Sequence, residues 1–204
     1  MKQKHLNSIP TNAELLSVVN GTDVLSVVVR GHQFVEAAVN AMISEALPAP
    51  HEVEIGRLTF ALKVDLAISL RLLRPDSRPL FMAITKVRNR FAHDPGAVFD
   101  SKESNDLCNT FSAFQRRLIG QRPNQLSAPE DVLSRAIAVA FIEAKRSRAR
   151  LYNGKLYDEA LHEMVEGTLR HRDGMPPDEH SRKVEEELQL RFEKKKASRA
   201  ELVT

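Results

Sequence analysis

Residues 79–95 read PLFMAITKVRNRFAHDP, an amphipathic stretch with a proline at each end. Its apolar side chains recur every three or four residues, at Leu80, Ile84, Val87 and Phe91. This is the period of one apolar helix face. Proline fits the first turn of a helix, and the residue before a proline avoids the helical region. We therefore predict one helix from about Pro79 to the Asp94–Pro95 step.

Apolar stripes with the same period extend to both sides, and the alternation typical of strands is nearly absent. A capping box at Thr11 and Glu14 opens a short first helix that ends at Gly21. Further helices are predicted over residues 22–47, 56–73, 100–120, 127–152 and 157–170. Residues 121–125 are predicted to be a linker, Asn153-Gly154 a turn and residues 173–177 a break in the chain.

The predicted fold is an all-α helical bundle with an extended, charged C-terminal helix. Residues 1–21 are predicted to be an N-terminal helical arm and residues 22–152 the bundle. Residues 153–204 are predicted to be a partly flexible helical extension. The length of 204 residues suits one domain with an appendage.

The composition favours a cytoplasmic protein. No stretch reaches the roughly 20 apolar residues that a membrane span needs, and the first residues do not lead into the apolar core of a secretory signal. The single cysteine, Cys108, cannot form an internal disulfide. The net charge of +3 is compatible with a nucleic-acid partner without indicating one.

The end of the helix over residues 79–94 holds the candidate chemistry. Asn89 and His93 lie four residues apart, so a continuous helix places one above the other. Arg88 lies about 100 degrees from Asn89, and we expect a frayed turn before Pro95 to bring its long side chain to the same ligand. An arginine and a histidine at this spacing are also typical of a solvated surface pair.

These residue types fit RNA cleavage without a metal or cofactor. Arginine binds phosphate through two parallel hydrogen bonds, and histidine titrates near neutral pH. His93 could take the proton of a ribose 2′-hydroxyl, which attacks the adjacent phosphate while Arg88 stabilises the charge, and Asn89 could fix the imidazole tautomer. One histidine cannot be base and acid at once, so a second copy from a symmetric dimer would help.

The sequence Arg88-Asn89-Arg90-Phe91-Ala92-His93 resembles the Arg-polar-x-x-x-His motif of the HEPN superfamily. A longer stretch resembles the mannitol operon repressor-like (MltR-like) branch. Its counterparts here are the helix from Gly56-Arg57-Leu58 to Leu73, the segment from Val87 to Asp94, and the turn Phe99-Asp100. The helix around residues 30–36 fits a first bundle helix, and the resemblance covers residues 22–120, up to 150 at most.

The superfamily resemblance implies a small, often dimeric helical bundle and a toxin or defence ribonuclease. It implies catalytic roles for Arg88 and His93, with Asn89 assisting, and an antitoxin as partner. The MltR-like resemblance implies gene regulation without catalysis, through a regulatory protein partner. A third reading is a structural dimer whose motif only stabilises a helix end.

Other residues are candidates for supporting roles. His32 occupies an apolar stripe, where most histidines are satisfied core residues; alternatively it lines the groove of His93, with Glu36 and Asp94 as further support. Arg90 and the basic run Lys145, Arg146, Arg148 and Arg150 are candidate RNA contacts, although cations also favour a helix C-terminus. His162 and His171 have no third ligand nearby, so no metal site is predicted.

Overall fold

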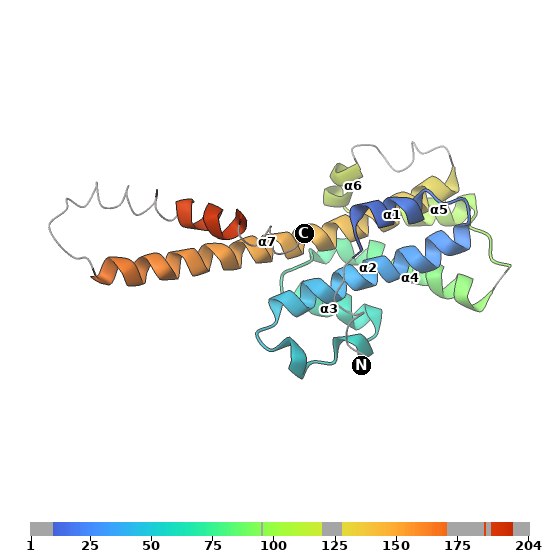
Figure 1. Cartoon of the computed structure of the whole chain (residues 1–204). Helices are drawn as coiled ribbons and strands as arrows, with labels where there is room; N and C mark the ends of the chain where they lie inside the picture. The colour runs from blue at the N-terminus through green and yellow to red at the C-terminus, as the bar shows by residue number, and fades with distance from the viewer. Residues whose placement is uncertain (1–9, 95, 120–127, 171–185, 187–188, 198–204) are drawn as a thin grey trace. The chain divides into compact units, whose positions relative to one another are not determined.

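The computed structural model describes the backbone of residues 10–94, 96–119, 128–170, 186 and 189–197. Within these ranges the chain is an all-helical bundle without strands, as predicted (Figure 1). The α-helices are α1 (Asn12–Val19), α2 (Val24–Ala46), α3 (Phe60–Ser69), α4 (Arg78–His93), α5 (Ser101–Asn109), α6 (Ala113–Ile119) and α7 (Pro129–Arg170). Short 3-10 turns are η1 (Pro50–Glu52), η2 (Ile55–Arg57) and η3 (Pro75–Ser77).

The chain divides into two compact units, residues 1–148 and 149–204. The first contains the hydrophobic core. In the second, α7 continues to Arg170, and residues 189–197 are helical with Leu190 exposed. Among the described helices, none is both long and apolar enough to cross a bilayer. The predicted linker at 121–125 and the break at 173–177 lie outside the described residues.

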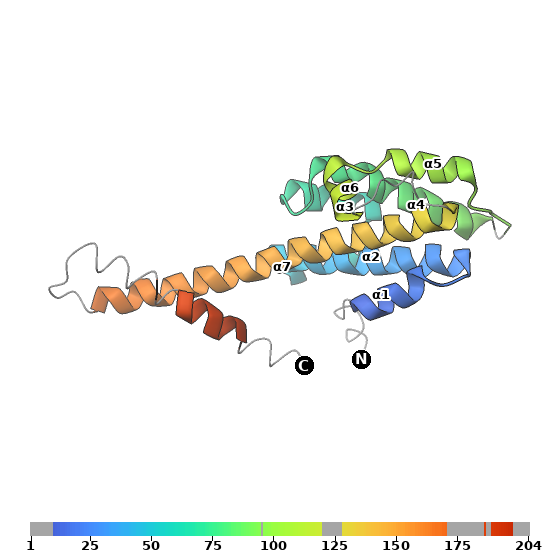
Figure 2. The same cartoon turned by 90° about the horizontal axis from the view of Figure 1, so that it is seen from above.

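Helix α2 is central to the first unit, because it contacts α1, α3 and α4. Its buried positions follow the helical period and include Val28, Val35, Val39 and Met42, which the sequence pattern predicted. In Figure 2, the part of α7 before residue 149 runs beside α2, with α5 and α6 on the other side of α7 from α1. The Ile137 side chain of α7 packs against Gly31 of α2, where an added Cβ would lie 2.7 Å from the Ile137 Cδ1 atom.

Local hydrogen bonds explain several helix ends. The capping box of Thr11 and Glu14 is present as predicted: Thr11 N–H donates to Glu14 Oε2 at 2.7 Å, and Glu14 N–H donates to Thr11 Oγ1 at 3.2 Å. Asp23 caps α2, and Asp100 caps α5. All four apolar residues predicted for the core face of α4 are buried.

The predicted single helix over residues 100–120 is wrong, because the chain breaks between Asn109 and Ala113 to give α5 and α6. A second capping box causes the break. Gln115 N–H donates to Ser112 Oγ, and Ser112 N–H donates to Gln115 Oε1, at 3.2 and 3.0 Å. The helix therefore restarts after Ser112.

The predicted turn at Asn153-Gly154 is also wrong, because α7 continues through both residues. Glycine in a helix interior costs only about 1 kcal/mol relative to alanine, which a long helix can absorb. The sequence of α3 predicts two apolar stripes, one of Leu62, Leu66, Leu70 and Leu73 and one of Phe60, Val64 and Ile68, and the first is not the buried face of the helix. Leu62 is 54% exposed, whereas Phe60, Val64 and Lys63 are buried.

A buried polar network ties the start of α4 to α6 and α7. Ser77 Oγ donates to Glu143 Oε1, and Gln115 Nε2 donates to Glu143 Oε2 at 2.9 Å. All three residues are at most 2% exposed. Burial raises the pKa of Glu143 above its ordinary value, although both hydrogen bonds oppose that rise.

Candidate functional site

The candidate site lies at the C-terminal end of α4. Asp94 has the extended backbone that Pro95 requires, with φ −130° and ψ 99°. Its N–H donates to the Arg90 carbonyl at 2.9 Å, and its Oδ1 accepts from the Gly96 N–H at 2.9 Å. The last turn is therefore closed, and the frayed turn predicted before Pro95 is absent. Asp94 therefore ends the helix and contacts the backbone of the following loop.

A closed last turn keeps Arg88 and His93 on different sides of the helix. Five residues of α-helix correspond to about 140 degrees around the axis. Arg88 is partly buried and donates from Nη1 to Asn89 Oδ1 at 2.9 Å. Asn89 and His93 are both exposed, one turn apart, as predicted. Within the described residues, no hydrogen bond joins Arg88 to His93, so one chain alone does not bring the pair together.

Arg90 is committed to the protein itself. Its Nη2 donates to the Val98 carbonyl at 2.8 Å and to Glu103 Oε2, and its guanidinium lies 5.2 Å from the centre of the Phe91 ring. These contacts tie α4 to the following loop and to α5. The prediction that Arg90 contacts nucleic acid is therefore not supported by its geometry.

His32 is a core residue and does not line an open groove with His93. It is 0% exposed and packs 4.7 Å from Phe60, ring centre to ring centre. Thr85 Oγ1 uses its proton to donate to the Phe81 carbonyl at 2.9 Å. The hydroxyl can then only accept, so His32 Nε2 carries the proton and donates to it at 3.3 Å. His32 Nδ1 is left without a hydrogen bond, 4.0 Å from Glu36 Oε2.

The neighbourhood of His32 keeps its imidazole neutral. Burial, with a smaller contribution from the charge of Arg88, lowers the pKa of His32 to about 4, and the charge of Glu36 opposes both effects. Lys63 also lowers the pKa of His32, and its Nζ donates to Glu36 Oε1 at 2.5 Å. Arg88 thus acts on the α2 side of α4, away from the exposed strip that carries His93.

Sequence reasoning missed two residues here. Lys63 is 1% exposed yet stands among apolar residues of α3, and its burial depends on Glu36, 27 positions earlier. Lys86 is exposed on α4, three residues before Asn89 and seven before His93, so the three share one strip. That spacing is visible in the sequence and could have identified Lys86.

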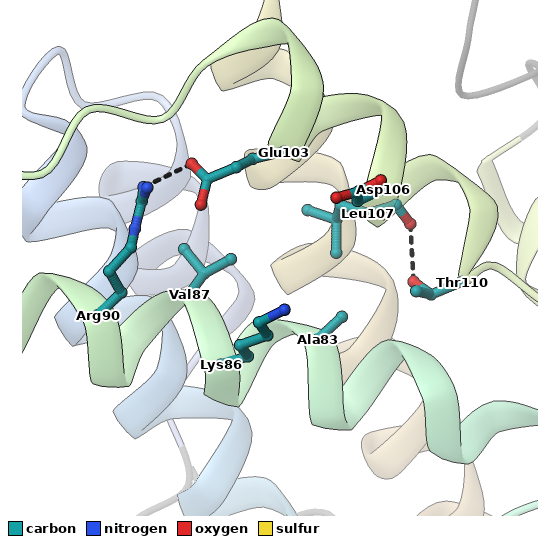
Figure 3. Close-up of a pocket in the computed structure, with 8 residues that line it drawn as sticks. All are labelled: Ala83, Lys86, Val87, Arg90, Glu103, Asp106, Leu107 and Thr110. Atoms are coloured by element: carbon teal, nitrogen blue, oxygen red, sulfur yellow. Dashed lines mark hydrogen bonds and ion pairs between the residues drawn. The ribbon is translucent and has the colours of Figure 1, made fainter.

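Lys86 also lines a groove of about 470 Å³ between α4 and α5 (Figure 3). The groove walls are Ala83, Lys86, Val87 and Arg90 on α4, and Glu103, Asp106 and Leu107 on α5 with Thr110 at its C-cap. A groove of this size can hold a small molecule or one unit of a polymer.

The basic residues Lys145, Arg146, Arg148 and Arg150 of α7 differ in their contacts and exposure. Lys145 donates to Asn12 Oδ1 at 3.0 Å and lies 5.3 Å from the centre of the Phe141 ring, so it ties α7 to α1. Arg146 and Arg148 are exposed in the first unit. Arg150 is exposed and belongs to the second unit. Two arginines of the first unit therefore present their charge to solvent.

In the part of the chain that the structure describes, no three histidine, cysteine, aspartate or glutamate side chains gather as metal ligands would. No protein-family model, no curated protein and no solved structure matches the chain. The resemblance to the HEPN superfamily and its MltR-like branch therefore stays a prediction, and the candidate site rests on the residues at the end of α4.

Proposed function

We propose that the protein is a HEPN-type ribonuclease that cleaves RNA without a metal, using Arg88, Asn89 and His93. The observation that carries the proposal is the exposed end of α4, where Asn89 and His93 stand one turn apart. Arg88, on the neighbouring side of the helix, donates a hydrogen bond to Asn89. An imidazole that solvent can reach and a guanidinium on the same helix end supply a proton acceptor and a phosphate ligand.

The proposed reaction is an attack by the ribose itself. His93 removes the proton from a 2′-hydroxyl, and the 2′-oxygen forms a bond to the adjacent phosphorus. The bond from phosphorus to the 5′-oxygen breaks, and that oxygen takes a proton from an imidazolium. The products are a 2′,3′-cyclic phosphate and a free 5′-hydroxyl. Arg88 stabilises the charge that develops on the phosphate oxygens.

The site needs a second copy of the chain for two reasons. The closed last turn of α4 separates Arg88 from His93 by about 140 degrees. In addition, one imidazole cannot accept the first proton and donate the second at the same moment. A homodimer with two α4 ends at its twofold axis would supply both imidazoles and place each arginine beside the other chain's histidine.

Replacing His93 tests the proposal directly. The full chain is incubated with total RNA in the presence of a chelator, and RNA ends are analysed for the cyclic phosphate. His93→Ala is expected to lower the cleavage rate by about 100-fold or more, the usual contribution of a general base. His51→Ala is the matched control, because the His51 side chain is 78% exposed on η1 and, among the described residues, pairs with its neighbour Glu52.

The folded state of each variant is checked by circular dichroism and its oligomeric state by light scattering. Equal cleavage by the unmodified chain and the His93→Ala variant, with both folded, would reject a catalytic role for this site. Loss of cleavage in the His51→Ala variant as well would show that the loss is not specific to His93.

A non-catalytic regulator or partner-binding module is the second candidate. The separation of Arg88 from His93 within one chain favours it, because a chain that acts alone lacks a complete site. Such a protein would keep its regulatory effect after His93→Ala and lose it when the chain is shortened after Asp173. Reporter expression from the regulated promoter measures both effects.

A further inference from the structure

The residues that line the groove between α4 and α5 have the same sequence spacing on both of its walls. The four residues of each wall lie at positions i, i+3, i+4 and i+7, which is one face over two turns. Ala83 and Val87 on α4 and Leu107 on α5 give the groove an apolar floor. The Arg90–Glu103 ion pair bridges the two helices, as Figure 3 shows.

Two charges in the groove remain unpaired. Lys86 extends from α4 and Asp106 from α5, and both are exposed. Neither side chain makes a hydrogen bond or ion pair to a described residue, and the two do not pair with each other. A ligand that fits therefore carries an anionic group for Lys86, hydrogen-bond donors for Asp106 and a flat apolar body for the floor.

Lys86 connects the groove to the end of α4. It shares an exposed strip with Asn89 and His93, at intervals of one turn. A polymer lying along that strip would place one unit at His93 and a neighbouring unit at the groove. An RNA strand has this form, with a phosphate in every unit and a base that can leave the stack.

We propose that the α4–α5 groove binds one nucleotide of an RNA strand and prefers guanine as its base. Lys86 contacts the phosphate, the base rests on Val87 and Leu107, and the Asp106 carboxylate accepts from the base edge. Guanine offers two adjacent N–H donors that fit both oxygens of one carboxylate, whereas adenine and cytosine offer an amino group alone and uracil one N–H between two carbonyls. This inference rests on the proposed function, because it makes the groove a specificity site beside His93.

The size of the groove favours a nucleotide over a partner helix. Two helical turns correspond to about 10 Å along the axis, and the apolar floor consists of three side chains. Stable protein interfaces bury about 800 Å² on each partner. A single nucleotide uses the two unpaired charges and the short floor together.

Mononucleotide binding tests the inference without any cleavage step. The full chain is titrated separately with guanosine, adenosine, cytidine and uridine 5′-monophosphates, and backbone amide shifts are followed by NMR. The guanine nucleotide is expected to bind about tenfold more tightly than the uracil nucleotide, as one bidentate contact provides. Its shifts should fall on α4 and α5.

Two variants assign the roles within the groove. Asp106→Asn is expected to remove the preference for guanine, and Asp131→Asn, the same change at an exposed position on α7, should keep it. Lys86→Ala is expected to make guanosine and its monophosphate bind equally, because the phosphate loses its partner.

The outcomes separate this inference from the proposed function. Equal affinity for all four nucleotides, or shifts outside α4 and α5, would overturn the guanine site even if RNA cleavage depends on His93. Guanine-selective binding with no RNA cleavage would reject the nuclease and keep the site. Shifts in α4 and α5 that follow chain concentration, with no response to nucleotides, would identify a second copy as the occupant and overturn the proposal.

Discussion

Glu143 is a buried carboxylate, and the free-energy cost of burying it depends on pH. Its pKa lies above the ordinary value because burial disfavours the charged form. The native state therefore binds a proton more tightly than the unfolded chain does. The resulting stabilisation is present below the ordinary pKa of the carboxyl and is lost as pH rises through the folded pKa.

Glu143→Gln is expected to remove this dependence. On acidification from pH 7 toward pH 5, the unmodified chain should gain stability relative to the glutamine variant. Glu143→Ala should cost about 2 kcal/mol or more at pH 7, because it leaves Ser77 and Gln115 without their buried partner. Urea unfolding at several pH values measures both effects, and parallel curves for the unmodified chain and the glutamine variant would contradict the assignment.

For His32 we predict the opposite dependence of folding stability on pH. Burial and the charge of Arg88 hold its pKa at about 4, below the ordinary 6.5. The unfolded chain therefore takes up a proton first as pH falls, and stability is lost between about pH 6.5 and pH 4. Relative to His32→Gln, the unmodified chain should lose about 2 kcal/mol between pH 7 and pH 5.

An NMR titration of the His32 ring checks the cause of that slope. Its resonances should stay those of neutral imidazole at pH 5.5. A titration midpoint near 6.5 for His32 would show that burial does not lower its pKa.

At the scale of the helix, Gly31 of α2 packs tightly against the Ile137 side chain of α7. An added Cβ would lie 2.7 Å from Ile137 Cδ1 and 2.9 Å from its Cγ2, so α2 and α7 would have to separate or Ile137 to shift. Alanine is a better helix former than glycine by about 1 kcal/mol, and overpacking a core costs about 1–3 kcal/mol. We expect Gly31→Ala to be destabilising on balance.

The double variant Gly31→Ala, Ile137→Val separates overpacking from other causes. Valine lacks the Cδ1 atom that makes the closest contact, so the second change should recover part of the lost stability. Thermal unfolding of the two single variants and the double variant measures the coupling. A double variant whose loss equals the sum of the single losses would show that the contact is not the cause.

The sequence predicted the helices where the apolar period and the caps agree. The core face of α4 and the Thr11–Glu14 capping box follow from neighbours within one turn, and both are confirmed. The break before α6 was missed although Ser112 and Gln115 form the same kind of box. An apolar stripe continues from Leu107 to Phe111 across the break, and this stripe is also the pattern of one uninterrupted helix.

Tertiary contacts explain the rest of the differences. Lys63 can be buried because Glu36 on α2 accepts a hydrogen bond from it. No sequence pattern within α3 predicts this partner. At the candidate site, the positions of Asn89 and His93 on one strip followed from their spacing. The closed last turn of α4 did not follow from the sequence. Pro95 predicts a frayed turn, but the hydrogen bond from Asp94 N–H to the Arg90 carbonyl is kept.

At the scale of the whole molecule, the proposed site joins two copies of the chain around a twofold axis. Each reaction would use His93 of both copies, one as base and one as acid. A dimer that mixes an unmodified chain with a His93→Ala chain would then lack one of the two groups. Independent sites within single chains would instead let each unmodified chain act alone.

Subunit mixing distinguishes the two arrangements. The unmodified and His93→Ala chains are mixed at a fixed total concentration, allowed to exchange, and assayed for RNA cleavage. At equal amounts, a shared site predicts about one quarter of the full rate, because random pairing gives that fraction of unmodified dimers. Independent sites predict about one half. Mixing with His51→Ala leaves His93 in every chain and should keep the full rate, so a decline in that control would show that exchange itself inactivates the protein.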